Sequence, residues 1–131
     1  MKSTSKWIQG MQSVVDNGRG HEVTIDLPPS QGGEDTGATA LELAVMGLSG
    51  CVGTIYALVA KNSGFSFEAL RVEVDADKGD KTIEKAEVKV YVKTDDPKKA
   101  ERVLVKTLSL CPVGVLFEQA EVRMKSELIC E

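Results

Sequence analysis

The sequence predicts an α+β domain in which mostly antiparallel strands accompany one long apolar helix. Three segments alternate apolar with polar residues, as half-buried antiparallel strands do: 21–27, 70–76 and 86–92. Residues 38–62 instead follow a helical period, with no charge between 43 and 60. With 131 residues, 42% of them hydrophobic, and no repeat or linker, the chain is expected to form a single domain over residues 1–131.

The N-terminal part predicts a hairpin followed by a loop. Residues 7–15 alternate imperfectly and are interpreted as one strand. Asp16-Asn17-Gly18 is a turn signal, and the alternating residues 21–27 follow it, so the two segments are expected to pair. Residues 28–37 contain two Pro and three Gly, which predicts a loop.

Residues 38–62 are predicted to form the long helix, ending at Ser63-Gly64. Its apolar stripe consists of Leu41, Val45, Leu48, Val52, Ile55 and Val59. By length alone the uncharged stretch would qualify as a membrane span. Gly, Ser and Thr dilute it, however, and the amphipathic strands need an apolar cover. We therefore expect no membrane segment but a central helix, buried by its own sheet on one side and by another element or subunit on the other.

The C-terminal half predicts a second hairpin, two helices and a last strand. Asp95-Asp96-Pro97 supplies an acidic cap and a first-turn proline, which predicts a helix running to about Leu110. A short apolar helix over 113–119 and a strand over 122–128 should follow Cys111-Pro112. The predicted order is β-β-α-β-β-α-α-β.

Composition and charge exclude several classes of function. The net charge is −4 and Lys is scattered among Glu, so no basic stripe predicts a nucleic-acid partner. Three cysteines and one histidine lack the short spacings of zinc sites, so we expect neither metal nor cofactor. The first residues lack the apolar segment of a signal peptide, which predicts a cytoplasmic protein with reduced thiols.

The cysteines are the candidate reactive groups. Cys51 lies about 80° from the centre of the apolar stripe, so it is either a plain buried cysteine or a thiol beside a seam of small residues. Cys111 stands at a helix start before Pro112, where free N–H groups favour a thiolate, unless cysteine merely tolerates the turn. Cys130, the penultimate residue, is interpreted as a frayed terminal thiol.

Two segments resemble a known family. The run from Gly37 to Cys51 is similar to the helix-start signature of the OsmC/Ohr family, and Cys111-Pro112-Val113 is similar to its second-cysteine motif. The sixty-residue spacing between the two cysteines also matches. The resemblance implies an OsmC-like fold, an intertwined homodimer with active sites at the subunit interface, and a thiol peroxidase that reduces organic hydroperoxides.

The resemblance also implies roles for individual residues. Cys51 would attack the peroxide and become a sulfenic acid, Cys111 would resolve it as a disulfide, and an external dithiol would reduce that disulfide. Arg19 resembles the arginine that activates the thiol in this family, although it also fits an ordinary turn arginine. The family's glutamate is replaced by Leu41, and Glu42 lies on the helix almost opposite Cys51.

Two alternatives to the peroxidase stay open. A binding module would hold a small hydrophobic ligand in the apolar seam of the dimer, with both cysteines as wall residues. A redox sensor would form a reversible disulfide that alters a partner surface, with slow peroxide turnover.

Overall fold

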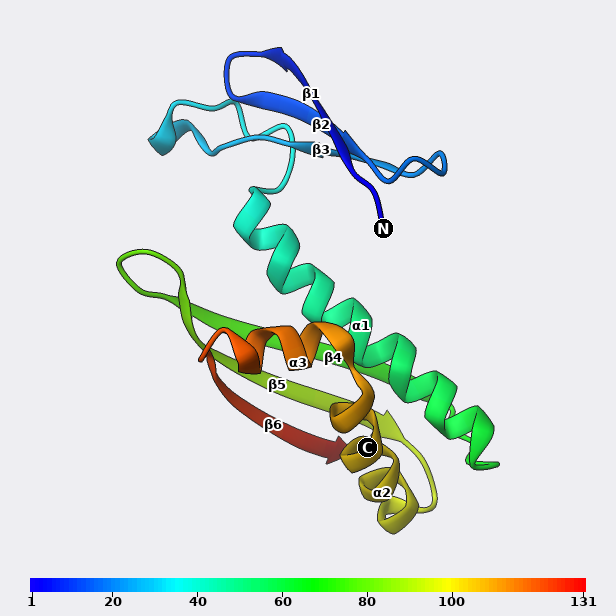
Figure 1. Ribbon diagram of the computed structural model, residues 1–131. Coiled ribbons are helices and arrows are strands. Elements are labelled where there is room, and N and C mark those ends of the chain that lie inside the picture. Colours follow the sequence, from blue (N-terminus) through cyan, green and yellow to red (C-terminus); the bar gives the residue numbers. More distant parts are fainter. The chain divides into compact units, whose positions relative to one another are not determined.

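The computed structural model describes residues 1–131 and confirms an α+β fold with one long apolar helix (Figure 1). The chain forms two compact units, residues 1–44 and 45–131. The long helix α1, Ala40–Asn62, begins in the first unit and continues in the second. A single domain over the whole chain stays a prediction.

The first unit is a three-stranded antiparallel sheet. Its strands are β1 (Thr4–Gln9), β2 (Gln12–Asp16) and β3 (Glu22–Ile25), in the order β1-β2-β3. The β2–β3 hairpin confirms the predicted turn, but the single strand predicted over residues 7–15 is wrong. The chain reverses at Gly10, whose φ of 49° lies in the left-handed region that glycine adopts readily. The indole N–H of Trp7 donates to the carbonyl of Gly10 at 2.9 Å and closes this turn.

A buried aspartate organises the predicted loop after β3, which also contains the 3-10 turn η1 (Pro29–Gln31). Asp26 is only 1% exposed, and its carboxylate accepts hydrogen bonds from four donors. These are the backbone N–H groups of Leu27 (2.8 Å), Glu34 (3.2 Å) and Thr36 (3.1 Å), and the Thr36 hydroxyl (2.8 Å). The hydrogen bonds from Thr36, chiefly that of its hydroxyl, lower the pKa of Asp26 below the usual 3.8.

We expect Asp26→Asn to lower the urea midpoint of unfolding at pH 7. Because the folded pKa of Asp26 is depressed, its ionised form stabilises the fold above pH 3.8 and loses this effect as pH falls through the folded value. The gap between variant and wild type should therefore shrink at pH 3 and below. Asp80→Asn, at an exposed turn residue without a hydrogen bond, is the control. Equal midpoints for Asp26→Asn and wild type at pH 7 would contradict the assignment.

The second unit contains a sheet in the order β4-β5-β6. The antiparallel pair β4 (Ala69–Lys78) and β5 (Ile83–Lys93) confirms the second predicted hairpin. Strand β6 (Arg123–Cys130) pairs parallel to β5, so the chain must cross over between them, and the two C-terminal helices form that connection. Cys130 pairs with Val92 as the last residue of β6, so the interpretation as a frayed terminal thiol is wrong.

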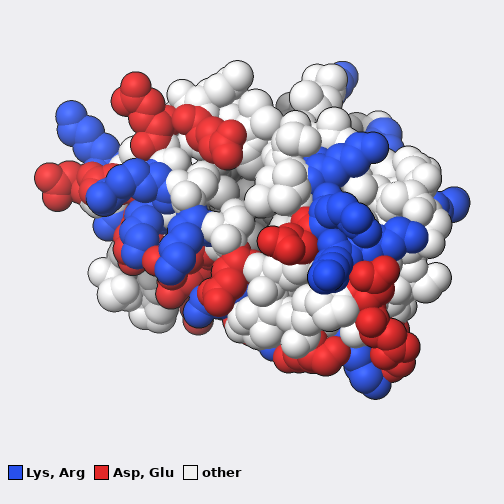
Figure 2. Space-filling model, turned by 90° about the horizontal axis from the view of Figure 1, so that it is seen from below, with Lys and Arg blue, Asp and Glu red and all other residues white.

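The two faces of this sheet differ in chemistry. On one face Val88, Val90 and Val92 of β5 are buried in the core with residues of α1 and of the C-terminal helices. The other face carries charges of both signs, including a 2.8 Å ion pair between Lys85 and Glu87. Lys, Arg, Asp and Glu are mixed on the side of the molecule shown in Figure 2. The strand alternation predicted from the sequence is therefore confirmed.

Helix α1 contributes five buried residues to the core of the second unit: Leu48, Val52, Tyr56, Val59 and Ala60. Tyr56 was absent from the predicted stripe; its hydroxyl donates to the carbonyl of Ala100 at 3.2 Å, and burial raises its pKa to about 12. Length and composition alone would let α1 cross a membrane, as they would many core helices of soluble proteins. The helix ends as predicted, at Gly64 with a φ of 61°.

Two further helices connect β5 to β6. The first, α2 (Pro97–Leu110), confirms the predicted acidic cap, because the carboxylate of Asp96 accepts from the N–H of Lys99 at 3.0 Å. The second, α3 (Pro112–Gln119), begins immediately after Cys111. Both helices pack on the core of the second unit, through residues such as Val103 and Phe117. Cys111 therefore lies between two helices, each held in place by its own buried residues.

Candidate thiol site

Two of the three thiols meet in the core of the second unit. The sulfurs of Cys51 and Cys111 lie 2.9 Å apart, with the thiol of Cys111 donating to Cys51. Both are free thiols, since a disulfide would bring the sulfurs to about 2.05 Å. Cys130 is a third free thiol, exposed at the end of β6. The structure thus brings together the two cysteines that the sequence singles out as a pair.

Cys51 owes its position to the middle of α1. Two buried residues of α1 flank Cys51 in the sequence: Leu48 precedes it and Val52 follows it. Their burial fixes the rotation of α1 against the core. Cys51 itself is half-buried at the edge of this contact and packs against the core. A residue at the border of the stripe therefore keeps part of its surface accessible to a reactant. Within the chain, Cys51 is the more accessible member of the pair.

Cys111 is fixed by the junction of α2 and α3. Its N–H donates to the carbonyl of Thr107 at 2.9 Å and completes the last turn of α2. Its sulfur accepts from the N–H of Gly114 at 3.3 Å and caps the first turn of α3. Pro112 at the first helical position has no N–H to leave unpaired and has a φ suited to a helix. These contacts hold the thiol in one place opposite Cys51.

Burial dominates the acidity of Cys111. The side chain is 0% exposed, and desolvation, followed by the hydrogen bond with Cys51, raises the pKa of its thiol to about 11. The N–H groups of Gly114 and Val113 act in the opposite direction, as the helix-start argument predicts, but their effect is smaller. The expectation that the helix start favours a thiolate at Cys111 is therefore wrong.

Arg19 and Glu42 both lie in the first unit. Arg19 is exposed in the β2–β3 turn, where its N–H donates to the side chain of Asn17 at 2.9 Å. The thiols belong to the second unit, so an approach of Arg19 to Cys51 stays a prediction. Glu42 accepts from the N–H of Thr39 at 2.7 Å, and the Thr39 hydroxyl accepts from the N–H of Glu42 at 3.2 Å. This capping box starts α1 and gives Glu42 a structural role.

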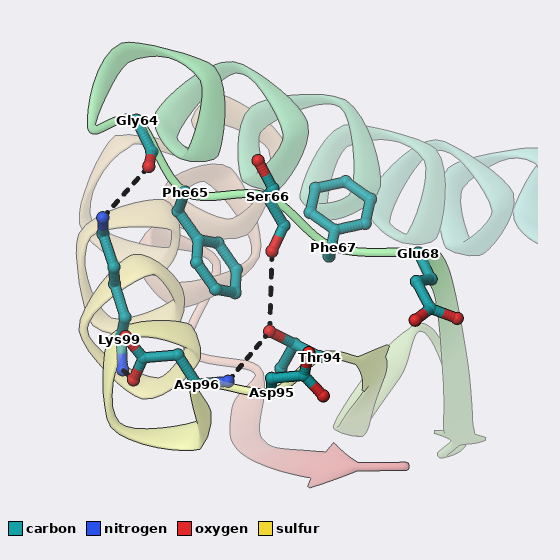
Figure 3. Close-up of a pocket in the computed structure, with 9 residues that line it drawn as sticks. All are labelled: Gly64, Phe65, Ser66, Phe67, Glu68, Thr94, Asp95, Asp96 and Lys99. Carbon is teal, nitrogen blue, oxygen red and sulfur yellow. Dashed lines mark hydrogen bonds between the residues drawn. The ribbon is translucent and has the colours of Figure 1, made fainter.

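One cavity of the second unit lies away from the thiols. It has a volume of about 400 Å³ and lies between the end of α1, the start of β4 and the start of α2 (Figure 3). Figure 3 shows the amine of Lys99 donating to the carbonyl of Gly64, at 3.0 Å, on one side of it. On another side the Thr94 hydroxyl donates to the carbonyl of Ser66 at 3.5 Å. Neither Cys51 nor Cys111 lines this cavity, so it is not part of the thiol site.

Potential metal ligands do not cluster in the structure. No group of three or more His, Cys, Asp or Glu side chains is arranged to hold a metal ion.

The chain belongs to the OsmC-like protein family, whose model matches residues 32–127. This range includes both cysteines of the site and confirms the resemblance noted in the sequence. None of the curated proteins matches the sequence.

Several solved structures share the fold. The OsmC-like protein from Mycoplasma pneumoniae has a TM-score of 0.86 at 11% identity, over 98% of this chain and 95% of that one. An organic hydroperoxide resistance protein from Elizabethkingia anophelis has a TM-score of 0.79 at 18% identity, over 98% and 94%. The organic hydroperoxide resistance protein OsmC from Legionella pneumophila has a TM-score of 0.76 at 16% identity, over 98% and 97%. At these identities the likeness shows the fold alone.

Sequence reasoning missed one local feature that has a recognisable signal. Thr39-x-x-Glu42 before an apolar run is the signature of a capping box, and it would have shown that Glu42 is structural. The bond from Gly114 to the Cys111 sulfur follows from placing that thiol at a helix start. The burial of Cys111 has no local signal, because it depends on how α1, α2 and α3 pack together.

Proposed function

We propose that the protein is a thiol peroxidase that reduces organic hydroperoxides through Cys51 and Cys111 in oxidative-stress defence. The observation that carries this proposal is the 2.9 Å separation of the two sulfurs. A sulfenic acid formed on one cysteine would have the other thiol already in contact, as a peroxidatic and a resolving cysteine require. The family and the structural relatives named as organic hydroperoxide resistance proteins support the same chemistry.

The proposed reaction has two steps on the protein. The thiolate of Cys51 attacks an oxygen of the hydroperoxide, the O–O bond breaks, and the alcohol leaves after taking a proton, so that Cys51 becomes a sulfenic acid. The Cys111 sulfur then attacks the Cys51 sulfur and loses its proton, water leaves, and a disulfide forms. An external dithiol reduces this disulfide by thiol–disulfide exchange, and both thiols return.

Accessibility and acidity support the assignment of these roles. Cys51 is half-buried, whereas Cys111 is fully buried and has its pKa raised to about 11. At neutral pH almost none of Cys111 is a thiolate, so it is a poor first nucleophile. A resolving thiol does not have to meet the peroxide, and contact with Cys51 is sufficient for it. The geometry therefore favours attack by Cys51 and resolution by Cys111.

The decisive experiment measures consumption of cumene hydroperoxide by the purified protein with dithiothreitol as the reductant. We expect many equivalents of peroxide to be consumed per protein, with the alcohol as the product. Less than one equivalent consumed, with no disulfide formed, would contradict the proposal. A reversible disulfide with very slow turnover would instead identify a redox sensor.

The redox sensor is the second candidate, and one observation favours it. The sulfurs of Cys51 and Cys111 form hydrogen bonds with each other and with the N–H of Gly114, but with no charged side chain. A thiol pair without a neighbouring cation reacts slowly with peroxide but can still form a disulfide. The binding module would be favoured if the protein co-purified with a small hydrophobic ligand and turned over no peroxide.

We propose that the protein is a cytoplasmic homodimer. Helix α1 exposes large apolar side chains in the second unit, including Met46 (56%) and Leu58 (51%), and such residues are typical of covered surfaces. The proposed cycle needs its disulfide to be reduced after each turnover, which fits a reducing compartment.

We expect light scattering to give about twice the chain mass of 14.1 kDa at micromolar concentration. Leu58→Glu should shift the protein toward the monomer, because a buried unpaired charge disfavours the interface. Lys125→Glu, a substitution in the charged face of the sheet, is the control and should leave the mass unchanged. A stable wild-type monomer would contradict the dimer.

We expect Arg19→Ala to lower the peroxidase rate if the guanidinium reaches Cys51 in the working protein. Loss of the cation would disfavour the charged thiolate relative to the neutral thiol, so less of Cys51 would be reactive near neutral pH. The pH–rate profile should move to higher pH, and Arg19→Lys should recover part of the rate. Lys81→Ala, in the exposed β4–β5 turn, is the matched control. An unchanged profile would show that Arg19 is only a turn residue.

A further inference from the structure

Helix α2 carries an unusual concentration of unpaired positive charge. Four cations (Lys98, Lys99, Arg102 and Lys106) stand against one carboxylate, Glu101, in a chain whose net charge is −4. None of the four forms an ion pair; the ion pairs of the protein involve only Arg71, Lys85 and Lys93 as cations. Figure 2 shows a group of Lys and Arg side chains on this side of the molecule. These cations therefore remain without an ion-pair partner in the chain, although Asp95 and Asp96 precede the helix.

A cavity with apolar walls adjoins three of these cations. Its volume is about 260 Å³, and it lies between the last turns of α1 and the face of α2. Its lining consists of Val59, Ser63, Lys99, Arg102, Val103 and Lys106. The two valines are buried and supply the apolar base of the cavity, and the three cations stand around them.

Some polar groups of this cavity already form hydrogen bonds within the chain, whereas others are free to bind a ligand. The hydroxyl of Ser63 already donates to the carbonyl of Val59 at 2.7 Å, and the amine of Lys99 donates to the carbonyl of Gly64 at 3.0 Å. Arg102 and Lys106, one turn apart on α2, make neither a hydrogen bond from their side chains nor an ion pair. They are free to bind a carboxylate, which the planar guanidinium of Arg102 can engage with two parallel hydrogen bonds.

We propose that this cavity binds a small amphipathic anion, namely a free carboxylate with a short alkyl chain, held by Arg102 and Lys106 with its chain against Val59 and Val103. A purely inorganic anion would leave the apolar base unused, and a neutral alkane would leave the cations without a partner. The site is separate from the thiol pair, because Val59 lies eight residues from Cys51 and so about 12 Å further along α1. The ligand would therefore bind independently of the peroxide chemistry.

Isothermal titration calorimetry with octanoate as the probe tests the proposal. We expect saturable binding with one site per chain, weakened by salt. Each added methylene from butanoate to octanoate should tighten binding about fourfold as long as the chain is buried. Octan-1-ol and inorganic phosphate should each bind at least about tenfold more weakly.

The matched variants are Arg102→Glu and Lys98→Glu, which change the charge of the same helix equally. Only Arg102 lines the cavity, so only Arg102→Glu should abolish octanoate binding, while both variants should keep the wild-type circular dichroism spectrum. Equal weakening by the two variants would show general charge attraction and overturn the proposal. It would also be overturned by octanol or phosphate binding as tightly as octanoate, or by binding to phosphatidylglycerol vesicles without binding to octanoate.

Discussion

Cys51→Ser is expected to abolish the consumption of organic hydroperoxide, leaving only the rate of the buffer with dithiol. This is the largest effect we predict for any substitution in the protein. The hydroxyl of serine does not ionise near neutral pH and is a far weaker nucleophile toward peroxide than a thiolate. Cys111 cannot replace it, because burial raises the pKa of its thiol to about 11 and keeps the sulfur out of contact with solvent. Peroxide-dependent loss of dithiol in a coupled assay is the measurement.

Cys111→Ser should give a different result when peroxide is added without dithiol. Cys51 should still react once with the hydroperoxide, and its sulfenic acid should persist long enough to be trapped and identified by mass spectrometry. The wild type should instead show a disulfide between Cys51 and Cys111 after peroxide treatment, since the sulfurs are already 2.9 Å apart.

Cys130→Ser provides the control for thiol chemistry that does not involve the pair. Cys130 is exposed at the end of β6. Its replacement by serine should leave peroxide turnover at the wild-type rate. Normal peroxide consumption by Cys51→Ser would refute the mechanism, and the binding module would then be the better account. Consumption by Cys111→Ser at the wild-type rate would show that an external thiol, and not Cys111, resolves the sulfenic acid.

The parts of the fold that follow from local chemistry could be predicted from the sequence. The second hairpin, the acidic cap of α2 and the glycine end of α1 each depend on residues within a few positions of one another. The division of residues 4–16 into two strands was missed, because Gly10-Met11 carries a weaker turn signal than Asp16-Asn17-Gly18. The parallel pairing of β6 with β5 was missed as well, since strand alternation does not specify the partner or its direction.

At the thiol site, too, features that depend on neighbouring residues could be predicted, whereas features that depend on packing could not. That Cys111 starts a helix could be predicted from Pro112, and the structure confirms it. The sign of its pKa shift could not, because the helix-start effect is local while the burial that outweighs it comes from packing. That Cys111 and Cys51 form a pair across sixty residues was a possibility raised by two thiols on two helices, and the family resemblance gave each of them a role. Helix periodicity by itself left Cys51 as either a core residue or a reactive thiol.

The same packing leads to the second large effect, which concerns Leu48. Leu48 is 0% exposed and lies one turn before Cys51 on α1, and its Cδ1 is 4.0 Å from the point that a Cβ on Gly114 would occupy. The side chain of Leu48 therefore packs from α1, which carries Cys51, against α3, which begins after Cys111. We expect Leu48→Ala to lower the free energy of unfolding by about 2–5 kcal/mol, through lost apolar burial and the cavity left behind.

Loss of stability alone would not show that Leu48 positions the thiol pair. A second measurement therefore has to follow the two thiols themselves. At a temperature where the variant remains folded by circular dichroism, peroxide-driven formation of the Cys51–Cys111 disulfide should be slower, because the two helices are no longer held at a fixed separation. The matched control is Leu116→Ala on α3, whose side chain is 61% exposed and should change stability by less than about 1 kcal/mol. If Leu48→Ala formed the disulfide as fast as Leu116→Ala, the packing of Leu48 would stabilise the fold without positioning the thiol pair.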